Sequence, residues 1–353
     1  MKMRSLLYLG LSGLTSTVLA ADLNVSGFGS IVGAKVVNGD GYMADYPNLG
    51  SYDDEWDVGQ ESRLGIQINS ALDDKTNLTM QVMSRANNEY QPSVEWLFIK
   101  HSLLDDLDIQ AGKLRLPVYY FSEYMDVGYA YPWVRIPSDT YSLDVTSFNG
   151  LKVNYRTYIG DLNMTASVFA GRQNNMHSEL MSYLFNADIS RDFRHLQGIA
   201  LDFSWNDTLL RTTYTEADMV ETAGVTVSDA IKISFTDVYL QQSFGNLTMM
   251  LEYNKYDPYY ESYFASVNYR MGNETYYLMW SKFDLDLPFE EHDTSSLGVR
   301  HEVSAKTAVK FDVSYFNDEG FNPFTNQPNP VYHADNDSNG DATIVSIGFD
   351  FIF

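Results

Sequence analysis

Residues 342–353 read ATIVSIGFDFIF, and they show the pattern that decides the fold. Apolar residues occupy every second position of this stretch: Val345, Ile347, Phe349, Phe351 and Phe353. Ser346, Gly348 and Asp350 lie between them. A period of two predicts a β-strand with one apolar and one polar face, because successive side chains of a strand point to opposite sides.

Segments of this kind repeat along the whole chain, and most are close to the roughly 9–11 residues of a tilted transmembrane strand. Helical periodicity of comparable length appears nowhere. We count sixteen segments: 23–36, 59–71, 76–85, 92–102, 107–113, 149–159, 162–172, 195–206, 208–217, 230–244, 246–256, 260–271, 274–284, 294–304, 307–317 and 342–353.

The connections between these segments alternate between short and long. The short ones are turn-like pairs such as Asp73-Asp74, Gly160-Asp161 and Gly272-Asn273. The long ones are 37–58, 114–148, 173–194, 217–229, 285–293 and 318–341, with brief members at 86–91 and 257–259. Tight turns at one end and long loops at the other are typical of outer-membrane proteins, so the sequence predicts an all-β, 16-stranded antiparallel transmembrane β-barrel.

A barrel in a membrane turns its apolar side chains to lipid and its polar ones inward. Sixteen strands enclose more space than side chains fill, which favours an aqueous lumen. Aromatic residues near strand ends suit interfacial girdles, with aromatic core packing as the alternative: Trp96, Tyr214, Tyr276, Tyr277 and Trp280.

The first twenty residues have the features of an export signal. Lys2 and Arg4 precede the apolar stretch 5–14, and Val18-Leu19-Ala20 forms a small-residue cleavage site. We therefore expect a signal peptide at 1–20 and a barrel at 21–353. An uncleaved anchor is the alternative, but the apolar stretch is short for a spanning helix.

Composition excludes several function classes. The chain has 47 acidic and 23 basic residues; without Lys2 and Arg4 the balance is 47 to 21, a formal charge of −26. Such a charge repels nucleic acid. With no cysteine, the chain has no disulfide framework, thiolate nucleophile or cysteine metal site.

The sequence resembles the trimeric 16-stranded porins of Gram-negative bacteria over residues 21–353. Residues 23–29 (LNVSGFG) are similar to the opening strand of many porins, and Phe349, Phe351 and Phe353 resemble the C-terminal signal for the barrel-assembly machinery. Loop 114–148 lies between the fifth and sixth strands, where porins fold a loop into the lumen. The Pro-Glu-Phe-Gly-Gly signature of enterobacterial general porins is absent from it, which indicates a separate branch.

Charge is sorted by region. Together with Asp284, the long-side loops carry 28 acidic residues against four basic ones, Arg115, Arg135, Arg191 and Arg194. We expect the loop to carry the constriction residues Arg115, Glu123, Asp126, Arg135, Asp139 and Asp144. We expect a basic lumen wall made by Arg63, Lys152, Arg156, Arg211, Lys232, Arg300 and Lys310. Loop carboxylates opposite this wall would make a transverse field that aligns dipolar solutes. The alternatives are merely solvated charges, or anion preference through Arg115 and Arg135.

A calcium site and an enzymatic site are the other candidates. Asp335, Asp337, Asn339 and Asp341 resemble the first half of a calcium loop, but Ser346 stands where a bidentate glutamate is required. We expect no cofactor, with divalent cations at acidic loops as an option. The six histidines are scattered and no Gly-x-Ser-x-Gly elbow occurs, so we expect no enzyme.

The sequence thus predicts a porin, a water-filled outer-membrane channel for passive diffusion of small hydrophilic solutes and ions. The resemblance implies a homotrimer in contact with outer-membrane lipid and lipopolysaccharide. Two alternatives remain open: an uptake channel specific for sugar, phosphate or dicarboxylate, and a surface adhesin or receptor displayed on a barrel.

Overall fold

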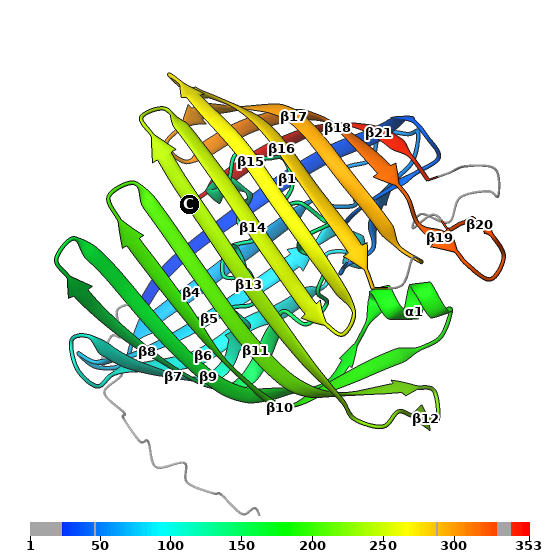
Figure 1. Cartoon of the computed structure of the whole chain (residues 1–353). Coiled ribbons are helices and arrows are strands. Elements are labelled where there is room, and N and C mark those ends of the chain that lie inside the picture. Colours follow the sequence, from blue (N-terminus) through cyan, green and yellow to red (C-terminus); the bar gives the residue numbers. More distant parts are fainter. Residues whose placement is uncertain (1–22, 46, 287–288, 330–339) are drawn as a thin grey trace, which may run out of the picture.

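The computed structural model describes residues 23–45, 47–286, 289–329 and 340–353. Sixteen long antiparallel strands form a closed barrel, in which β1 pairs with both β4 and β21 (Figure 1). They are β1 (Leu23–Asn38), β4 (Arg63–Ala71), β5 (Thr76–Arg85), β6 (Pro92–Ser102), β7 (Leu107–Arg115), β8 (Ser147–Ile159), β9 (Leu162–His177), β10 (Ile189–Trp205), β11 (Thr208–Ala223), β13 (Ile231–Phe244), β14 (Leu247–Asp257), β15 (Tyr260–Met271), β16 (Glu274–Leu285), β17 (Glu291–Ser304), β18 (Thr307–Asp318) and β21 (Ala342–Ile352). The fold predicted from the sequence is confirmed.

The shorter elements lie in the long loops. They are β2 (Tyr42–Asp45), β3 (Gly50–Tyr52), β12 (Thr226–Val227), β19 (Phe321–Asn322), β20 (Gln327–Pro328), α1 (Glu179–Phe185) and two 3-10 turns, η1 (Ala86–Asn88) and η2 (Gly128–Ala130). Figure 1 shows α1, β12, β19 and β20 together at one end of the barrel, which we call the long-loop end. In the described part of the chain, no helix has the length and apolar character to cross a membrane.

The largest departure from the predicted segments lies in β9, β10 and β11, which extend far into the predicted loops. β10 begins at Ile189 rather than at residue 195, and α1 follows β9 with the Ser178 side chain accepting the Met181 N–H as its N-cap. A β-bulge between Arg194 and Gln197 interrupts the period of two. The alternation of apolar and polar residues therefore breaks at the bulge, although strand β10 continues through it.

The two ends of the described chain are neighbours in the barrel. Phe28 is opposite Ile352, and the Gly27 N–H donates to the Phe353 carbonyl at 3.1 Å. The Phe353 ring covers Gly27, where a Cβ would overlap it. The sequence features at both ends therefore form one seam, which pairs β1 with β21 and closes the barrel.

The expectation of an apolar outer face and a polar inner face is met only in part. Leu151, Val168 and Leu278 point outward and are exposed, as lipid-facing residues are. The inner face is not uniformly polar, because Tyr239 and Phe264 are buried inside the barrel. This corrects the expectation of a lumen lined throughout by polar groups.

Two residues assigned to the aromatic girdle also face inward. The Tyr277 side chain is buried and its hydroxyl donates to Asp312 at 3.1 Å. Trp96 alternates with the exposed Leu97, and its ring lies 6.3 Å from that of Phe98. Tyr214, Tyr276 and Trp280 are exposed on the outer face, consistent with a girdle.

A row of three glycines crosses the sheet beside the start of the longest loop. Gly112 is opposite Gly150, and Gly150 is opposite Gly171. Gly112 has a φ of 139°, which favours glycine. A Cβ on Gly150 would overlap the Ala170 carbonyl oxygen, which is backbone and cannot swing away. The row therefore allows β7, β8 and β9 to approach closely at this point.

We expect Gly150→Ala to destabilise the barrel by about 1–3 kcal/mol, because the added methyl group pushes two strands apart. Urea unfolding of the protein in lipid vesicles measures this difference. Gly348→Ala is the matched control, since its Cβ meets only ordinary contacts at 3.5 Å or more. Equal stability of the two variants would contradict the close approach of the strands.

Candidate functional site

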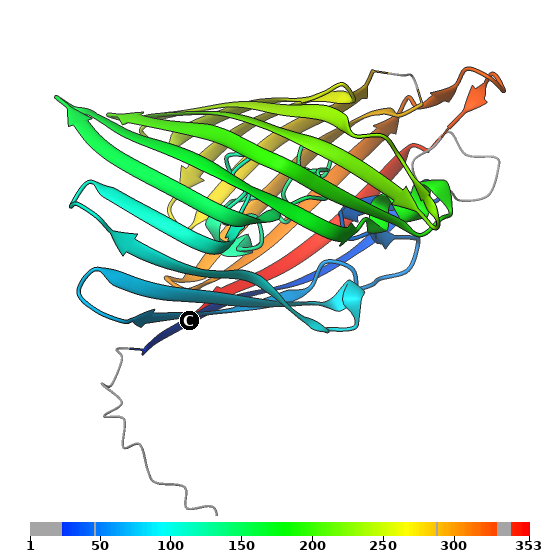
Figure 2. The ribbon, with the colours of Figure 1, turned by 90° about the horizontal axis from the view of Figure 1, so that it is seen from below.

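The candidate site is the loop at residues 116–146, which joins β7 to β8 and which we call the infolded loop. Figure 2 shows its trace inside the barrel rather than at the rim. The turn η2 in this loop contacts β1 and β21. Arg115, predicted as a loop residue, is the last residue of β7. The inward fold of the loop, which the resemblance to porins implied, is confirmed.

An aromatic face of the infolded loop packs against β13, β14, β15 and β16. The Tyr120 ring stacks on Tyr239 at a centroid distance of 3.6 Å and an angle of 6°. Trp133 is fully buried, contacts Phe264 edge-on, and donates its indole N–H to Ser266 at 3.0 Å. Burial of one such ring stabilises the packed loop by about 2–3 kcal/mol. The loop is thus fixed to one side of the lumen by hydrophobic packing.

Two of the predicted wall bases hold the backbone of this loop. Lys310 donates to the carbonyl oxygens of Gly128 and Trp133, both at 2.6 Å. Arg300 donates to the carbonyl oxygens of Tyr129 and Tyr131 at 2.6 and 2.9 Å. These bases lie inside the barrel as predicted, but they are buried as loop anchors.

Arg135 lies away from the other predicted constriction residues. Its guanidinium forms an ion pair with Glu61 at 2.8 Å and donates to Ser346 at 3.0 Å. Burial opposes its charge, yet Glu61 and Asp312 raise the pKa of Arg135 well above its usual value. It therefore acts as a fixed cation between the infolded loop and the wall.

Asp139 and Asp144 do not face the predicted wall bases, and their partners are other side chains. Asp139 accepts hydrogen bonds from Ser281 at 2.5 Å and from His292 at 2.8 Å, and all three side chains are buried. Asp144 pairs with Arg191 at 3.3 Å and accepts from Ser178 at 2.5 Å. The six predicted loop residues therefore separate into several places.

The predicted arrangement of loop carboxylates against wall bases exists at Asp126 and Glu123. Asp126 pairs with Arg85 at 2.9 Å and with Arg115 at 3.2 Å, and its carbonyl oxygen accepts from Arg63 at 2.8 Å. Burial opposes the charge of Asp126, but Arg85, Arg115 and Arg63 together hold its pKa well below normal.

Glu123 forms the second contact, an ion pair with Lys152 at 2.7 Å. Lys152 is the main cause that lowers the pKa of Glu123 to about 2. The acids and bases are thus in direct contact here, rather than separated by an open gap.

Four charged side chains near this cluster keep substantial contact with solvent. About a third or more of each is exposed: Glu123 (39%), Asp202 (38%), Arg156 (38%) and Lys100 (35%). They come from the infolded loop and from β10, β8 and β6, and we call them the charged track. The buried Asp108 connects its two bases, at 2.7 Å from Arg156 and 3.6 Å from Lys100.

Sequence reasoning missed Arg85, Glu95 and Lys100 as site residues. Arg85 and Lys100 lie in predicted strands, on the inward side of each alternation, which was the signal available. Glu95 pairs with Arg85 at 2.9 Å. It lies at a β-bulge, so the alternation in the sequence does not show that its side chain points inward.

The predicted wall residue Lys232 is on the other side of the sheet. It alternates with the buried Ile233 and shares its parity with the exposed Val238, so it points outward. There it pairs with Glu216 at 3.3 Å. The assignment of Lys232 to the lumen was wrong. Strand β13 extends beyond the apolar belt toward the long-loop end, and in that part of the strand charged residues occur on both faces of the sheet. Arg211 is inside as predicted, 3.6 Å from Asp202.

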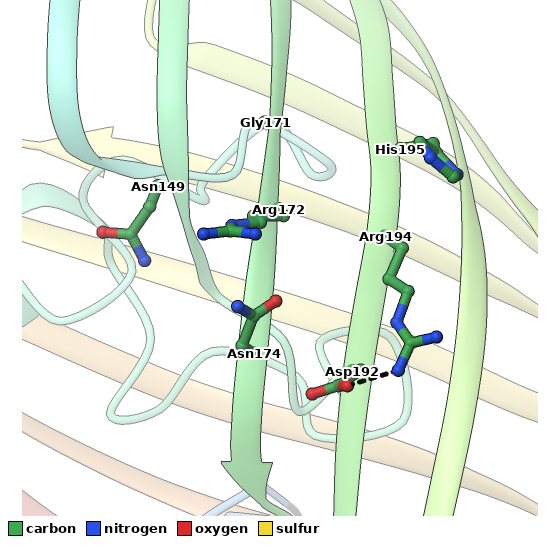
Figure 3. A pocket seen from close by; sticks show the side chains of 7 residues that line it. All are labelled: Asn149, Gly171, Arg172, Asn174, Asp192, Arg194 and His195. Atoms are coloured by element: carbon green, nitrogen blue, oxygen red, sulfur yellow. Dashed lines mark hydrogen bonds and ion pairs between the residues drawn. The ribbon is translucent and has the colours of Figure 1, made fainter.

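A polar hollow lies on the outer face of β8, β9 and β10 (Figure 3). Arg172 and Arg194 contribute its basic groups, and Arg194 pairs with Asp192 at 2.9 Å. His195 occupies the bulge with a φ of 51°. The exposed apolar residue Val168 precedes this hollow along β9, and its exposed neighbour Ile199 follows the hollow along β10. The hollow therefore marks the boundary of the apolar belt.

The calcium candidates Asp335, Asp337 and Asn339 lie outside the described residues. Asp341 is described, and its carboxylate accepts the backbone N–H of Asp318 at 3.0 Å. Among the residues that the structure describes, no group of three or more His, Asp or Glu side chains is arranged to hold a metal ion.

The apolar outer belt, the closed sheet and the infolded loop define a membrane channel of the β-barrel class. The sequence profile of Gram-negative porins matches residues 9–351, and the chain belongs to this family. It is a passive diffusion channel of the outer membrane.

Solved structures support the fold. The anion-selective porin from Comamonas acidovorans is 13% identical with a TM-score of 0.60, over 94% of this chain and 100% of that one. The channel DcaP of Acinetobacter baumannii is 10% identical with a TM-score of 0.60, over 94% and 97%. OmpT of Vibrio cholerae is 12% identical with a TM-score of 0.55, over 94% and 98%. No curated protein matches the sequence.

The Glu123–Lys152 pair predicts a pH dependence. Because the pKa of Glu123 is lowered, the pair stabilises the folded loop above the ordinary value of 4.5, and this stabilisation is lost as the pH falls toward about 2. We expect reversal potentials that respond to this group only in that acidic range. In Lys152→Met the response shifts to higher pH, because the main cause of the lowered pKa is removed. An identical pH response in both proteins would contradict the assignment.

Proposed function

We propose that solutes pass along the charged track, between the infolded loop and the inner face of β6, β8 and β10. The opposite side of the lumen is filled by the aromatic packing of the loop, which leaves this side for water. The carrying observation is the exposure of Glu123, Asp202, Arg156 and Lys100 inside an otherwise buried set of charges.

The track has two acidic and two basic members, so its field is dipolar. A small zwitterion or polar neutral molecule can align with such a field, whereas an apolar molecule would have to lose ordered water. We infer weak ion selectivity and passage of small hydrophilic solutes. Family and fold favour a channel over an enzyme.

Single-channel reversal potentials test this path. We expect Glu123→Gln to shift permeability toward chloride and Arg156→Gln toward potassium, each by about twofold, because each removes one charge of the track. Lys232→Gln is the control: it removes a charge from the outer face and leaves the potential unchanged. The proposed path is wrong if neither track variant differs from the control. Liposome swelling with graded sugars separates a smooth size limit from a single favoured solute.

We also propose the export and assembly steps that the sequence predicts. A signal peptide at residues 1–20 lies outside the described residues, and cleavage after Ala20 would deliver the barrel to the periplasm. Phe353 would then present the C-terminal signal to the assembly machinery. A homotrimer is supported by the trimer form in which OmpT of Vibrio cholerae was solved.

We further propose that the hollow of Figure 3 contacts lipopolysaccharide. Arg172 and Arg194 lie on the outer face at the upper boundary of the apolar belt, where phosphate groups of this lipid are located. Guanidinium groups pair with phosphate through parallel hydrogen bonds. Asn149 and Asn174 also line the hollow, and their side-chain amides add neutral hydrogen-bond donors.

Replacing Arg172 and Arg194 together by glutamine is expected to weaken lipopolysaccharide binding about tenfold. Binding of labelled lipopolysaccharide to the detergent-solubilised protein provides the measurement. The control replaces both by lysine, which keeps the charge and should keep most of the affinity. A glutamine variant that binds as tightly as the lysine variant would rule out the hollow as a contact site.

A further inference from the structure

A cavity of about 360 Å³ lies at the long-loop end, away from the charged track. Its walls come from the end of the infolded loop, from α1 and from the upper parts of β10, β11, β14, β15 and β16. The volume is within the range of sites that hold small organic molecules. The cavity is therefore large enough for a ligand with a ring and a short side chain.

The floor of the cavity is aromatic. Tyr256, Tyr260 and Phe283 are buried members of the cluster that fixes the infolded loop. Tyr259 is half-buried at the wall, and Phe185 of α1 is exposed at the rim. Aromatic faces of this kind bind apolar rings by stacking and attract cations through their negative π faces.

The charged groups of the cavity are unbalanced. Asp144, Glu221 and Glu290 are acidic, whereas Arg191 is the one basic group among the described lining residues. Arg191 already donates to Asp144 at 3.3 Å and to Glu221 at 3.0 Å. The cavity therefore carries a net negative charge, which disfavours anions.

One carboxylate oxygen of Asp144, a residue that lines the cavity, has no hydrogen-bond partner among the described residues. The Asp144 side chain is only 6% exposed. Its Oδ2 atom accepts from Ser178 and Arg191, but its Oδ1 atom is buried without a hydrogen-bond partner among the described residues. An unpaired buried acceptor costs free energy, so a ligand that donates to Oδ1 gains affinity.

We propose that this cavity is a binding site for organic cations, namely a primary ammonium group attached to an apolar or aromatic body. The ammonium N–H donates to Oδ1 of Asp144, and the body lies against Tyr256 and Tyr259. The acidic loops around the mouth concentrate such cations near the site. The site is separate from the charged track, so it does not depend on the proposed solute path.

The test is isothermal titration of the full-length folded protein in detergent with 2-phenylethylammonium chloride. We expect saturable binding, and no binding of 3-phenylpropionate, which has similar shape and the opposite charge. Asp144→Asn should weaken binding at least about tenfold, since a charge-assisted hydrogen bond is lost. The absence of saturation at about 10 mM, or equal binding of the anion or of glucose, would overturn the proposal.

Two further variants separate this site from general attraction to an acidic mouth. Asp54→Asn removes one exposed carboxylate from the first long loop, far from the cavity in sequence, and should leave the affinity unchanged. Tyr259→Leu keeps an apolar wall but removes the aromatic face, and should weaken binding even if Asp144→Asn does not fold. Equal losses in Asp54→Asn and Tyr259→Leu would refute a defined site. Reversal potentials, measured separately, report on the solute path.

Discussion

The structure depends on the hydrogen bonds that join β1 to β21 and close the sheet. In a lipid bilayer every backbone N–H and C=O group needs a partner within the protein, because no water is available to replace one. Sixteen strands can meet this requirement only as a ring. The backbone groups of β1 and β21 pair from Phe28 and Ile352 onward along both strands, so the barrel sheet has no free edge at this seam. The infolded loop and the charged track occupy the space that this ring creates.

A ring of this size encloses more volume than its own side chains fill, and the infolded loop divides that volume in two. On one side the loop is packed by rings such as Tyr120 and Trp133, and this region excludes water. On the other side carboxylates of the loop meet arginine and lysine side chains of the wall. Hydrophobic packing thus determines where the loop lies, and ion pairs determine which face it turns to the remaining channel.

The same loop connects the two proposed sites. Its first half carries Glu123 and Asp126 to the charged track, and its last residues carry Asp144 to the cavity at the long-loop end. The aromatic cluster between them includes Tyr256 and Phe283, which also form the floor of that cavity. The packing that fixes the constriction therefore also shapes a second site, although the charged groups of the two sites are different.

The sequence by itself determined the strand number and the order of long and short connections, because a period of two and turn residues are local properties. The infolded loop was implied by the resemblance to porins. The sequence also placed Lys152 and Glu123 in the right region. The sequence could not determine which face of the sheet a side chain occupies beyond a bulge, as at residues 194–197. It also could not do so outside the apolar belt, as at Lys232. Only the tertiary structure decided which acid meets which base, because Asp126 and Arg85, or Asp139 and His292, are distant in the chain and meet through the closure of the barrel.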